Sequence, residues 1–352
     1  MAQSDSFPVG SKRIGLGFPC FLIAEVGQAH DGSLGLAHSF IDAAADAGAD
    51  AIKFQTHIAE AESTLDEQWR IKFSYEDSTR YDYWKRISFS SEQWTQLCMH
   101  ASDRKIIFLS TAFSVEAFEL LSRLNIPAWK IASGELLSNF LLDRFIASGK
   151  PLLISSGMSS WIELKELTKK LIACNSNYCF LQCTSKYPTT LKDVGLNVIA
   201  EMRNLLGPIV GLSDHTGNID VLKTAIARGA NVIEAHITFD KKMFGPDSES
   251  SLTRTEFAEL VKYRDTVFEL DSNPVNKDLL AAELSNMRNL FMRSVALKAD
   301  AVAGTILTLD MLTLKKPASG IPESKLQSLV GKALARDVSA RRLLTESDLV
   351  NE

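Results

Sequence analysis

Eight short apolar runs in this sequence are each followed by side chains that can bind a ligand or move a proton. The run that ends in GLSDHT, residues 211–216, closes on Ser213 and His215. One such ending has a plain structural explanation, such as a helix cap or a hydrogen-bonded core histidine. Eight endings of this kind instead indicate a polar pocket. The residues concerned are Glu25, Lys53, Gln55, Thr111, Lys130, Ser133, Glu135, Ser155, Thr184, Tyr187, Ser213, His215 and His236.

Two histidines end the last two of these runs. If the runs are neighbouring strands, the imidazoles of His215 and His236 can converge on one ion. Neutral imidazole suits Mn, Fe, Co or Zn, with carboxylates and water completing the coordination. Glu25 ends the first run, so closure of the sheet would bring it beside His236, within reach of the metal or of a metal-bound water. The alternative is two unrelated, hydrogen-bonded histidines.

Two lysines stand inside apolar runs, where a charged group is costly unless an anion meets it. Together with nearby hydroxyl groups, Lys53 and Lys130 predict a pocket for a phosphate or a carboxylate. Structural pairing with a glutamate, for example Lys130 with Glu135, is the competing interpretation.

The elements that must position these groups alternate regularly. Apolar runs without strict alternation are typical of parallel strands covered on both faces. They span residues 20–26, 51–55, 105–111, 128–133, 151–156, 178–184, 208–213 and 231–236. Amphipathic stretches follow at 34–48, 90–103, 114–124, 136–148, 159–173, 194–206, 218–229 and 251–270. Eight such units predict a (β/α)₈ TIM barrel, with its site at the carboxyl ends of the strands. A doubly wound open sheet is the alternative.

Composition excludes several classes of protein. The 352 residues have a formal net charge of −5, which argues against nucleic acid as a partner. No apolar stretch reaches the length of a membrane span, and the first residues lack the apolar core of a signal peptide. Five cysteines without CxxC spacing indicate neither a disulfide framework nor a zinc knuckle. We therefore expect a protein of the reducing cytoplasm.

Several motifs, in order along the chain, resemble the sialic acid synthase (N-acetylneuraminate synthase) family. They are IAEVGQAHDGS (23–33), IKFQTH (52–57), WKIASGE (129–135), ISSGM (154–158), CTSKYPT (183–189), GLSDHT (211–216), EAHIT (234–238) and FGPDSESSLT (244–253). They cover nearly the whole predicted barrel, so the resemblance is specific.

The tail extends this resemblance. Residues 300–312 (DAVAGTILTLDML) and 337–349 (DVSARRLLTESDL) repeat one pattern, which predicts a compact pseudo-symmetric module. A helical hairpin is the plainer interpretation. The resemblance implies a barrel over 1–270, a linker over 271–290, and an antifreeze-like (SAF) domain of mostly irregular and β structure over 291–352. It also implies a domain-swapped homodimer.

The resemblance further implies an activity. The family condenses phosphoenolpyruvate with an open-chain aldose, usually N-acetylmannosamine, and water, giving a nine-carbon 2-keto-3-deoxy acid and phosphate. A divalent metal, Mn²⁺ or Mg²⁺, held by His215 and His236 would polarise the aldehyde, and Glu25 or Glu135 would handle the proton of the water. Phosphoenolpyruvate would contact Lys53, Thr111, Lys130, Ser133, Ser155, Ser185 and Ser213. The sugar would contact Gln55, Tyr187, Asp247, His236 and Lys316.

Three positions depart from the family pattern. Ser185 and Ala29 stand where many members have asparagine, and Lys316 stands where many have an arginine that touches the N-acetyl group of the sugar. Lysine cannot present a planar, bidentate fork of donors. The acceptor could therefore be N-acetylmannosamine, a bis-acetamido precursor of legionaminic or pseudaminic type, or a plain hexose. The segment 58–90, rich in charges and aromatic rings, is expected to lie over the sugar.

Three other functions compete. A synthase of 3-deoxy sugar-phosphate acids would need a second basic cluster, and the sugar-side residues are mostly uncharged. A metal-dependent TIM-barrel hydrolase would use the two histidines but would not need Lys53 and Lys130. A non-enzymatic, polysaccharide-associated protein should have lost the strand-end groups, and they are present.

Overall fold

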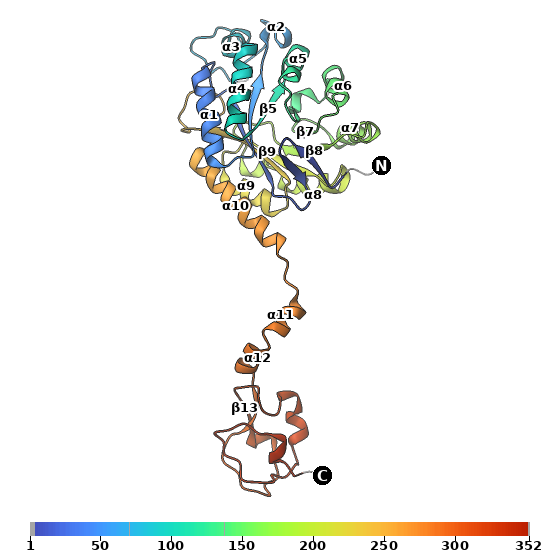
Figure 1. The fold of residues 1–352 in the computed structure, drawn as a ribbon, viewed down its shortest axis with the longest axis vertical. Helices are drawn as coiled ribbons and strands as arrows, with labels where there is room; N and C mark the ends of the chain where they lie inside the picture. Colours follow the sequence, from blue (N-terminus) through green and yellow to red (C-terminus); the bar gives the residue numbers. More distant parts are fainter. Residues whose placement is uncertain (1–3, 70, 137, 351–352) are drawn as a thin grey trace. The chain divides into compact units, whose positions relative to one another are not determined.

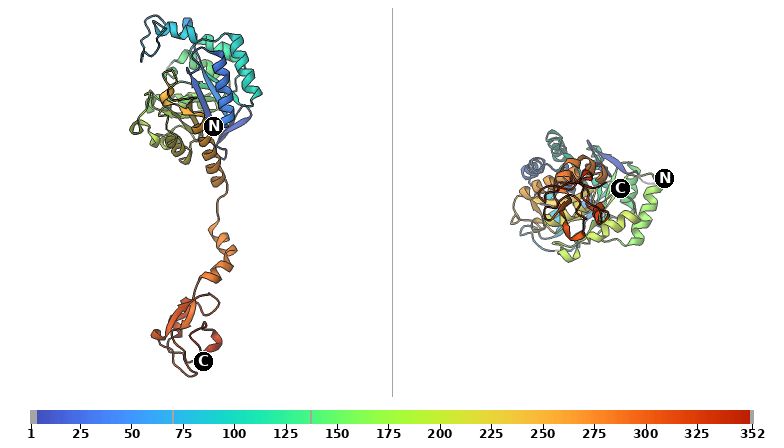
Figure 2. Two further views of the ribbon diagram at one scale, coloured as in Figure 1. Left: turned by 90° about the vertical axis from the view of Figure 1, so that its left-hand side faces the viewer. Right: turned by 90° about the horizontal axis from the view of Figure 1, so that it is seen from below.

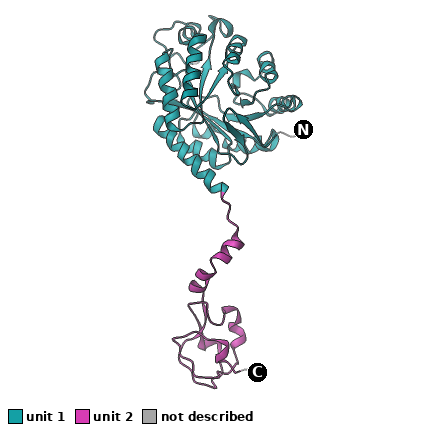
Figure 3. Cartoon of the chain, in the orientation of Figure 1, with its two compact units in different colours: residues 1–272 teal, residues 273–352 magenta. Residues whose placement is uncertain are grey.

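The chain forms two compact units, residues Met1–Ser272 and Asn273–Glu352 (Figure 3). The computed structural model describes residues 4–69, 71–136 and 138–350. Each unit has its own hydrophobic core, so each is described separately.

Unit 1 contains a closed barrel of eight parallel strands (Figure 1). Neighbours in the sheet follow the order of the chain, and the last barrel strand pairs with both its predecessor and the first. This closure confirms the predicted (β/α)₈ barrel and excludes the open sheet. The strands are β3 (Phe21–Gly27), β4 (Ala51–Thr56), β5 (Ile107–Ala112), β6 (Trp129–Ile131), β7 (Leu152–Ser155), β8 (Tyr178–Cys183), β9 (Val210–Asp214) and β10 (Val232–Thr238).

Helices surround the strands, as Figure 1 and the turned views of Figure 2 show. Serine side chains cap several of them: Ser33, Ser90 and Ser160 each accept a hydrogen bond from a backbone N–H of the first turn. The barrel helices are α1 (Leu34–Ala47), α4 (Ser91–Asp103), α5 (Val115–Arg123), α6 (Asn139–Ala147), α7 (Trp161–Ala173), α8 (Leu196–Leu205), α9 (Ile219–Ala227) and α10 (Arg254–Ser272). Additional short elements are α2 (Ala59–Glu62), α3 (Arg80–Ile87) and β11 (Leu252–Thr253).

An N-terminal hairpin contributes to the core inside the barrel. Strands β1 (Ser6–Val9) and β2 (Lys12–Gly15) pair antiparallel, and Phe7 and Ile14 are buried. Their side chains join one apolar cluster with residues at the amino-terminal ends of the strands, such as Phe21 and Ala51. This packing fills the amino-terminal half of the barrel. Chemistry is therefore confined to the opposite end, where the polar residues stand.

A buried ion pair ties the last helix of unit 1 to its first strands. Arg264 of α10 places Nη1 2.7 Å from Asp50 Oδ2 and also donates to the carbonyl oxygen of Cys20, 3.2 Å away. The same Asp50 oxygen accepts from the backbone N–H of Leu22 at 2.8 Å. Both charged side chains are almost fully buried. Breaking such a pair leaves an uncompensated charge in the interior.

We therefore expect Asp50→Asn to lower the free energy of unfolding of the barrel by about 3–5 kcal/mol. The matched control is Asp265→Asn, because Asp265 is exposed and pairs with the same guanidinium at 2.6 Å; it should cost less than about 1 kcal/mol. Urea unfolding followed by tryptophan fluorescence measures both, since all five tryptophans lie in unit 1. If the two variants lost the same free energy of unfolding, the buried Asp50–Arg264 pair would contribute no more than the exposed Asp265–Arg264 pair, contrary to our prediction.

Unit 2 begins with two short helices, α11 (Lys277–Glu283) and α12 (Ser285–Phe291), neither of which has a buried residue. The predicted linker at 271–290 thus contains helical turns. A small antiparallel pair follows, β12 (Ser294–Leu297) and β13 (Leu312–Lys315), with irregular and 3₁₀ structure around it. The helical-hairpin interpretation of the tail is wrong.

The predicted internal repeat folds as two equivalent halves. Asp300 accepts a hydrogen bond from the backbone N–H of Ala340, and Asp337 accepts one from Ala303. Each aspartate thus holds the residue three places after the other. Backbone N–H and carbonyl groups of Ala301 and Val338 also bond reciprocally, at 3.0 and 2.8 Å. These reciprocal hydrogen bonds are what a pseudo-two-fold arrangement of the two halves requires.

The five cysteines are free thiols. Among the described residues, no helix has both the length and the apolar character needed to cross a bilayer.

Candidate active site

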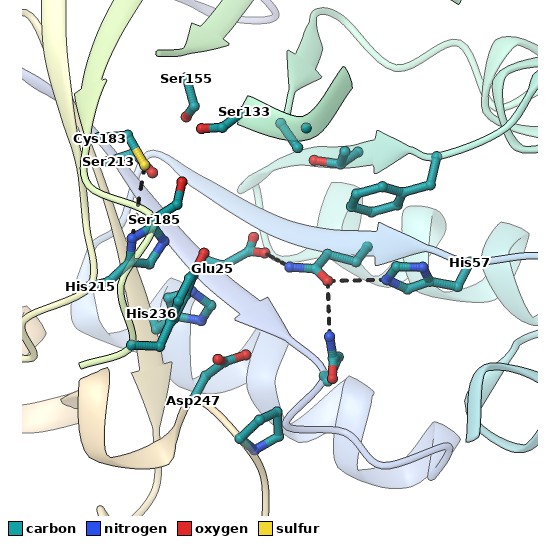
Figure 4. A pocket seen from close by; sticks show the side chains of 18 of the residues that line it. Glu25, His57, Ser133, Ser155, Cys183, Ser185, Ser213, His215, His236 and Asp247 are labelled. Carbon is teal, nitrogen blue, oxygen red and sulfur yellow. Dashed lines mark hydrogen bonds between the residues drawn. The ribbon is translucent and has the colours of Figure 1, made fainter. Parts of the chain in front are cut away.

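A cavity of about 490 Å³ opens at the carboxyl ends of the barrel strands (Figure 4). Its size falls within the range usual for small-molecule sites. Thirteen residues that the sequence predicts for the site line it: Glu25, Lys53, Gln55, Thr111, Lys130, Ser133, Ser155, Ser185, Tyr187, Ser213, His215, His236 and Asp247.

Strand alternation explains why these side chains converge. Residues two apart on a strand point to the same face, so Lys53 and Gln55 of β4 enter the cavity together. Glu234 and His236 do the same on β10. Because all eight strands run in parallel, their final inward residues meet at one end of the barrel.

The floor of the cavity is a buried network of two lysines and two glutamates. Lys53 Nζ lies 2.7 Å from Glu25 Oε2 and donates to Thr111 Oγ1 at 3.2 Å. Lys130 Nζ lies 3.1 Å from Glu234 Oε1, and Glu234 also approaches Lys53 at 3.9 Å. Lys130 thus pairs with Glu234 and not with Glu135. Sequence reasoning missed Glu234, although its spacing of two from His236 is a usable signal.

Proton equilibria in this network follow from burial and charge. Burial alone would lower the pKa of Lys53, but the carboxylates of Glu234 and Glu25 outweigh it, so the pKa lies above its ordinary value. Burial likewise opposes ionisation of Glu234, yet Lys130 and Lys53 lower its pKa. Lys53 and Glu234 are therefore charged at neutral pH.

Opposite charges balance along the cavity wall. Among the described lining residues, three cations (Lys53, Arg80, Lys130) accompany three carboxylates (Glu25, Glu234, Asp247). A substrate with several negative charges would therefore meet ammonium groups that are already partly neutralised. A further positive charge at the site would therefore favour the binding of such a substrate.

Hydroxyl groups surround one backbone loop near Lys130. Gly157 donates its N–H to Ser133 Oγ at 3.0 Å. A Cβ at Gly157 would come within 2.4 Å of Ser185 Oγ and 2.8 Å of Ser133 Oγ, so any other residue here would displace these hydroxyl groups. Among the described residues, the buried Ser155 Oγ has no hydrogen-bond partner. An unpaired buried hydroxyl is costly, which suggests that a ligand completes it.

His215 and His236 face each other across the cavity, with ring centroids 5.6 Å apart. His215 Nδ1 lies 3.2 Å from the carbonyl oxygen of Thr184, which can only accept, so Nδ1 carries the proton and Nε2 keeps its lone pair. Burial, together with the neighbouring His236 ring, lowers the pKa of His215 to about 3. This ring is therefore neutral at ordinary pH, the form that binds metals.

The second histidine is equally suited to a ligand role. His236 Nδ1 is buried and has no hydrogen-bond partner among the described residues. Strand β3 ends beside it at Gly27, whose φ is +55° and whose hypothetical Cβ would lie 3.1 Å from the His236 ring. No cluster of three or more metal-binding side chains occurs in the described parts of the chain. The two imidazoles thus fit a divalent ion whose remaining positions are taken by water or substrate.

Aromatic residues of the 58–90 segment line the outer part of the cavity, as the sequence predicted for this segment. Trp69, Phe73, Tyr83 and Trp84 contribute, and Phe73 stacks edge-to-face on Tyr83 at 5.0 Å. Apolar ring faces beside hydroxyl and carboxylate groups suit a sugar.

Three predicted site residues do not line the cavity. Thr184 instead donates its hydroxyl to the carbonyl oxygen of Asp193 at 2.7 Å. Glu135 ends a 3₁₀ turn (Ser133–Glu135) after β6 and does not line the cavity. Burial and the nearby Glu62 carboxylate raise its pKa. Lys316 belongs to unit 2, where its ammonium group lies 5.1 Å from the Phe291 ring.

The structure also adds residues that sequence reasoning missed. Besides Glu234, the cavity is lined by Gln28, His57 and Cys183. Lys53, Gln55 and His57 follow one another at intervals of two, so the alternation of β4 could have revealed His57. Cys183 places Sγ 3.9 Å from His215 Nδ1.

Comparison with known proteins agrees with this geometry. The family model described as the NeuB family matches residues 40–275, and the SAF domain model matches residues 293–350. The N-acetylneuraminate-9-phosphate synthase of Homo sapiens is 38% identical over 319 residues, 89% of this chain and 88% of that protein.

Further similarity comes from bacteria. The N,N'-diacetyllegionaminic acid synthase of Legionella pneumophila is 35% identical over 343 residues, 94% of this chain and 95% of that protein. The crystal structure of the N-acetylneuraminic acid synthetase of Leptospira borgpetersenii serovar Hardjo-bovis superposes with a TM-score of 0.72 and 29% identity. That comparison covers 82% of this chain and 98% of the other.

Fold and site together define a (β/α)₈-barrel enzyme with a polar pocket at its strand ends, followed by a small β domain. The chain belongs to the NeuB family and ends in an SAF domain. It is an enzyme of the sialic acid synthase type.

Proposed function

We propose that this enzyme condenses phosphoenolpyruvate with the open-chain aldehyde of an N-acylated amino sugar of the N-acetylmannosamine type. Water is consumed, and the products are a nine-carbon 2-keto-3-deoxy acid and phosphate. The observation that carries the proposal is one cavity holding two buried lysines, an unpaired serine hydroxyl and two imidazoles that face each other.

The donor end is assigned to the lysine side of the cavity. Lys53 and Lys130 provide charge-assisted donors, and Ser155, with Ser133, Ser185, Ser213 and Thr111, provides hydroxyl donors. A phosphate and a carboxylate on one small molecule match such a set. Both the phosphate and the carboxylate are negatively charged and need cationic partners. The glutamates would keep the two lysines charged and in position until the substrate binds.

The acceptor end is assigned to the histidine side. His215 and His236 would hold Mn²⁺ or Mg²⁺, which supplies Lewis-acid polarisation of the aldehyde oxygen. Gln55, Tyr187 and Asp247 would bind hydroxyl groups of the sugar.

The reaction then forms a bond between C3 of phosphoenolpyruvate and the aldehyde carbon. Water adds to C2, its proton is accepted by a general base, and the C–O bond to phosphate breaks. We assign this proton transfer to Glu25, a choice supported by its place in the cavity between Lys53 and Gln55, whereas Glu135 does not line the cavity.

A hydrolase would need the imidazoles but gives no role to the buried lysines. A synthase of 3-deoxy sugar-phosphate acids would share the donor end, and the difference lies in the acceptor.

The experiment is therefore a phosphate-release assay with phosphoenolpyruvate, Mn²⁺ and a panel of acceptors. The panel contains N-acetylmannosamine, its 6-phosphate, a bis-acetamido hexose, mannose and a pentose phosphate.

We expect phosphate release with at least one N-acylated hexose, and a product whose mass is the acceptor plus the three-carbon pyruvyl unit. Release only with the pentose phosphate, or none with any acceptor, would contradict the proposal. Chelation of the metal should abolish release and Mn²⁺ should restore it.

The tail is proposed to act within a homodimer. Helices α11 and α12 expose Leu279, Leu290 and Phe291 and bury no residue, which supports a role for them against another surface. Lys316 would then reach the substituent on C2 of the sugar in the site of the partner subunit. Arginine at this position would favour N-acetyl groups more strongly through its fork of donors.

A further inference from the structure

A row of hydrogen bonds connects the floor of the cavity to the 58–90 segment (Figure 4). Glu25 Oε1 accepts from Gln55 Nε2 at 2.9 Å. Gln55 Oε1 lies 3.1 Å from His57 Nε2, and His57 Nδ1 lies 2.6 Å from Glu62 Oε1. The row therefore begins at the proposed proton-accepting carboxylate and ends on α2.

Hydrogen-bond chemistry determines which atom donates at each step. Glu25 is paired with Lys53 at 2.7 Å, so it accepts, and the Gln55 amide must turn its NH₂ group towards it. The amide oxygen of Gln55 then faces His57, so Nε2 of His57 donates. On the other side of the ring, Nδ1 shares a hydrogen bond with Glu62 Oε1. The imidazole is therefore held at both of its nitrogens.

Packing holds this ring in one orientation. His57 lies between two aromatic rings, with centroids 3.8 Å from Trp84 at an interplanar angle of 17° and 4.4 Å from Phe113 at 10°. Such stacking on both faces fixes the plane of the ring. The side chains of His57 and Glu62 are only 7% and 8% exposed, so water competes little for their hydrogen bonds.

We propose that His57 and Glu62 are a positioning pair that fixes the Gln55 amide and, through it, the Glu25 carboxylate. The proposal deepens the function given above and rests on it where Glu25 is concerned. His57 does not touch the reacting atoms in this scheme. It prevents Gln55 from rotating by 180°, which would place an amide oxygen against the carboxylate and swing Glu25 out of line.

The pair also links the catalytic carboxylate to the 58–90 segment. Glu62 is the last residue of α2, and Trp84, which stacks on His57, belongs to α3. Trp69 and Phe73 of the same segment line the outer cavity. Seating of this segment and alignment of Glu25 thus depend on the same imidazole.

The test begins with His57→Phe, which keeps a flat ring between Trp84 and Phe113 but removes both ring nitrogens. We expect kcat to fall by about 10- to 100-fold, the usual cost of losing an orienting partner. The Michaelis constant for phosphoenolpyruvate should change by less than about twofold, because Lys130 keeps its partner Glu234 and both lysines keep their charge. His38→Phe, on α1 outside the cavity, is the matched control and should leave the kinetics unchanged.

A double-mutant cycle separates positioning from a general structural effect. If His57 acts through Gln55, the His57→Phe change should cost less than about twofold in a Gln55→Leu background, since the amide it orients is already gone. Losses that multiply in the double variant would overturn the proposal.

A second measurement does not depend on activity. Nitrogen-15 NMR of histidine-labelled protein, with His57→Phe to assign the signal, should show that Nε2 is protonated, because it donates to the Gln55 amide oxygen. A His57 ring with its proton on Nδ1 alone would overturn the hydrogen-bond scheme even if the enzyme is active. If the wild type releases no phosphate with any acceptor, the proposed function fails, and the NMR result alone decides the pairing.

Discussion

Replacing His236 by alanine is expected to lower kcat by about three orders of magnitude or more, since several kcal/mol of transition-state stabilisation correspond to about 10³-fold in rate. The ring is buried at the end of β10, its Nδ1 has no hydrogen-bond partner among the described residues, and it faces His215 across 5.6 Å. Alanine removes one of only two imidazoles that we assign to the metal. Both charge and orientation at the acceptor aldehyde would be lost.

Metal content provides an independent readout for this variant. After dialysis, the wild type should retain Mn²⁺ and His236→Ala should retain much less, measured by elemental analysis. His38→Ala is the control, because that imidazole bonds to His100, 2.8 Å away on α4, and lies outside the cavity. Wild-type turnover and metal content in the His236 variant would show that the ion is held elsewhere.

Lys130→Met should raise the Michaelis constant for phosphoenolpyruvate by about 10- to 150-fold, the equivalent of about 1.5–3 kcal/mol for a hydrogen bond to a charged group. Methionine has a similar length but no charge. Lys130 is 3% exposed, so bulk solvent cannot replace its interaction with the anion. Lys169→Met, in an exposed ion pair with Glu166 on α7, is the control and should have no effect.

A second variant distinguishes substrate binding from structural pairing. Lys130 Nζ lies 3.1 Å from Glu234, so the lysine could serve only to neutralise that carboxylate. If so, the double variant Lys130→Met with Glu234→Gln should recover a normal Michaelis constant, because no unpaired charge remains. If Lys130 contacts the donor anion, the Michaelis constant stays high in the double variant. Recovery would therefore contradict our assignment of the donor end.

Much of the fold could be predicted from the sequence because local patterns report it directly. Eight apolar runs with polar endings, separated by capped amphipathic stretches, specify parallel strands and covering helices. Serines at the start of these helices, such as Ser90 and Ser160, cap the first turn. The inward residues of the strand ends follow from the two-residue period, and so most of the predicted site residues do line one cavity.

Other features depend on side chains brought together from distant parts of the chain. Glu234 holds Lys130, and Asp50 holds Arg264 across 214 positions. The two-residue period can place Glu234 on the inward face of its strand, but no local pattern specifies which charges pair. The short turn after β6 removes Glu135 from the cavity, although its position in the sequence suggested the opposite.

The stacking of His57 between Trp84 and Phe113 likewise joins three separate segments. The sequence by itself determined the barrel and the polar groups at the strand ends, because period and spacing encode which way a side chain points, and its resemblance to a known family implied the SAF tail. Only the tertiary structure decided which charges meet and which carboxylate faces the substrate, because those depend on distances across the barrel that no spacing along the chain contains.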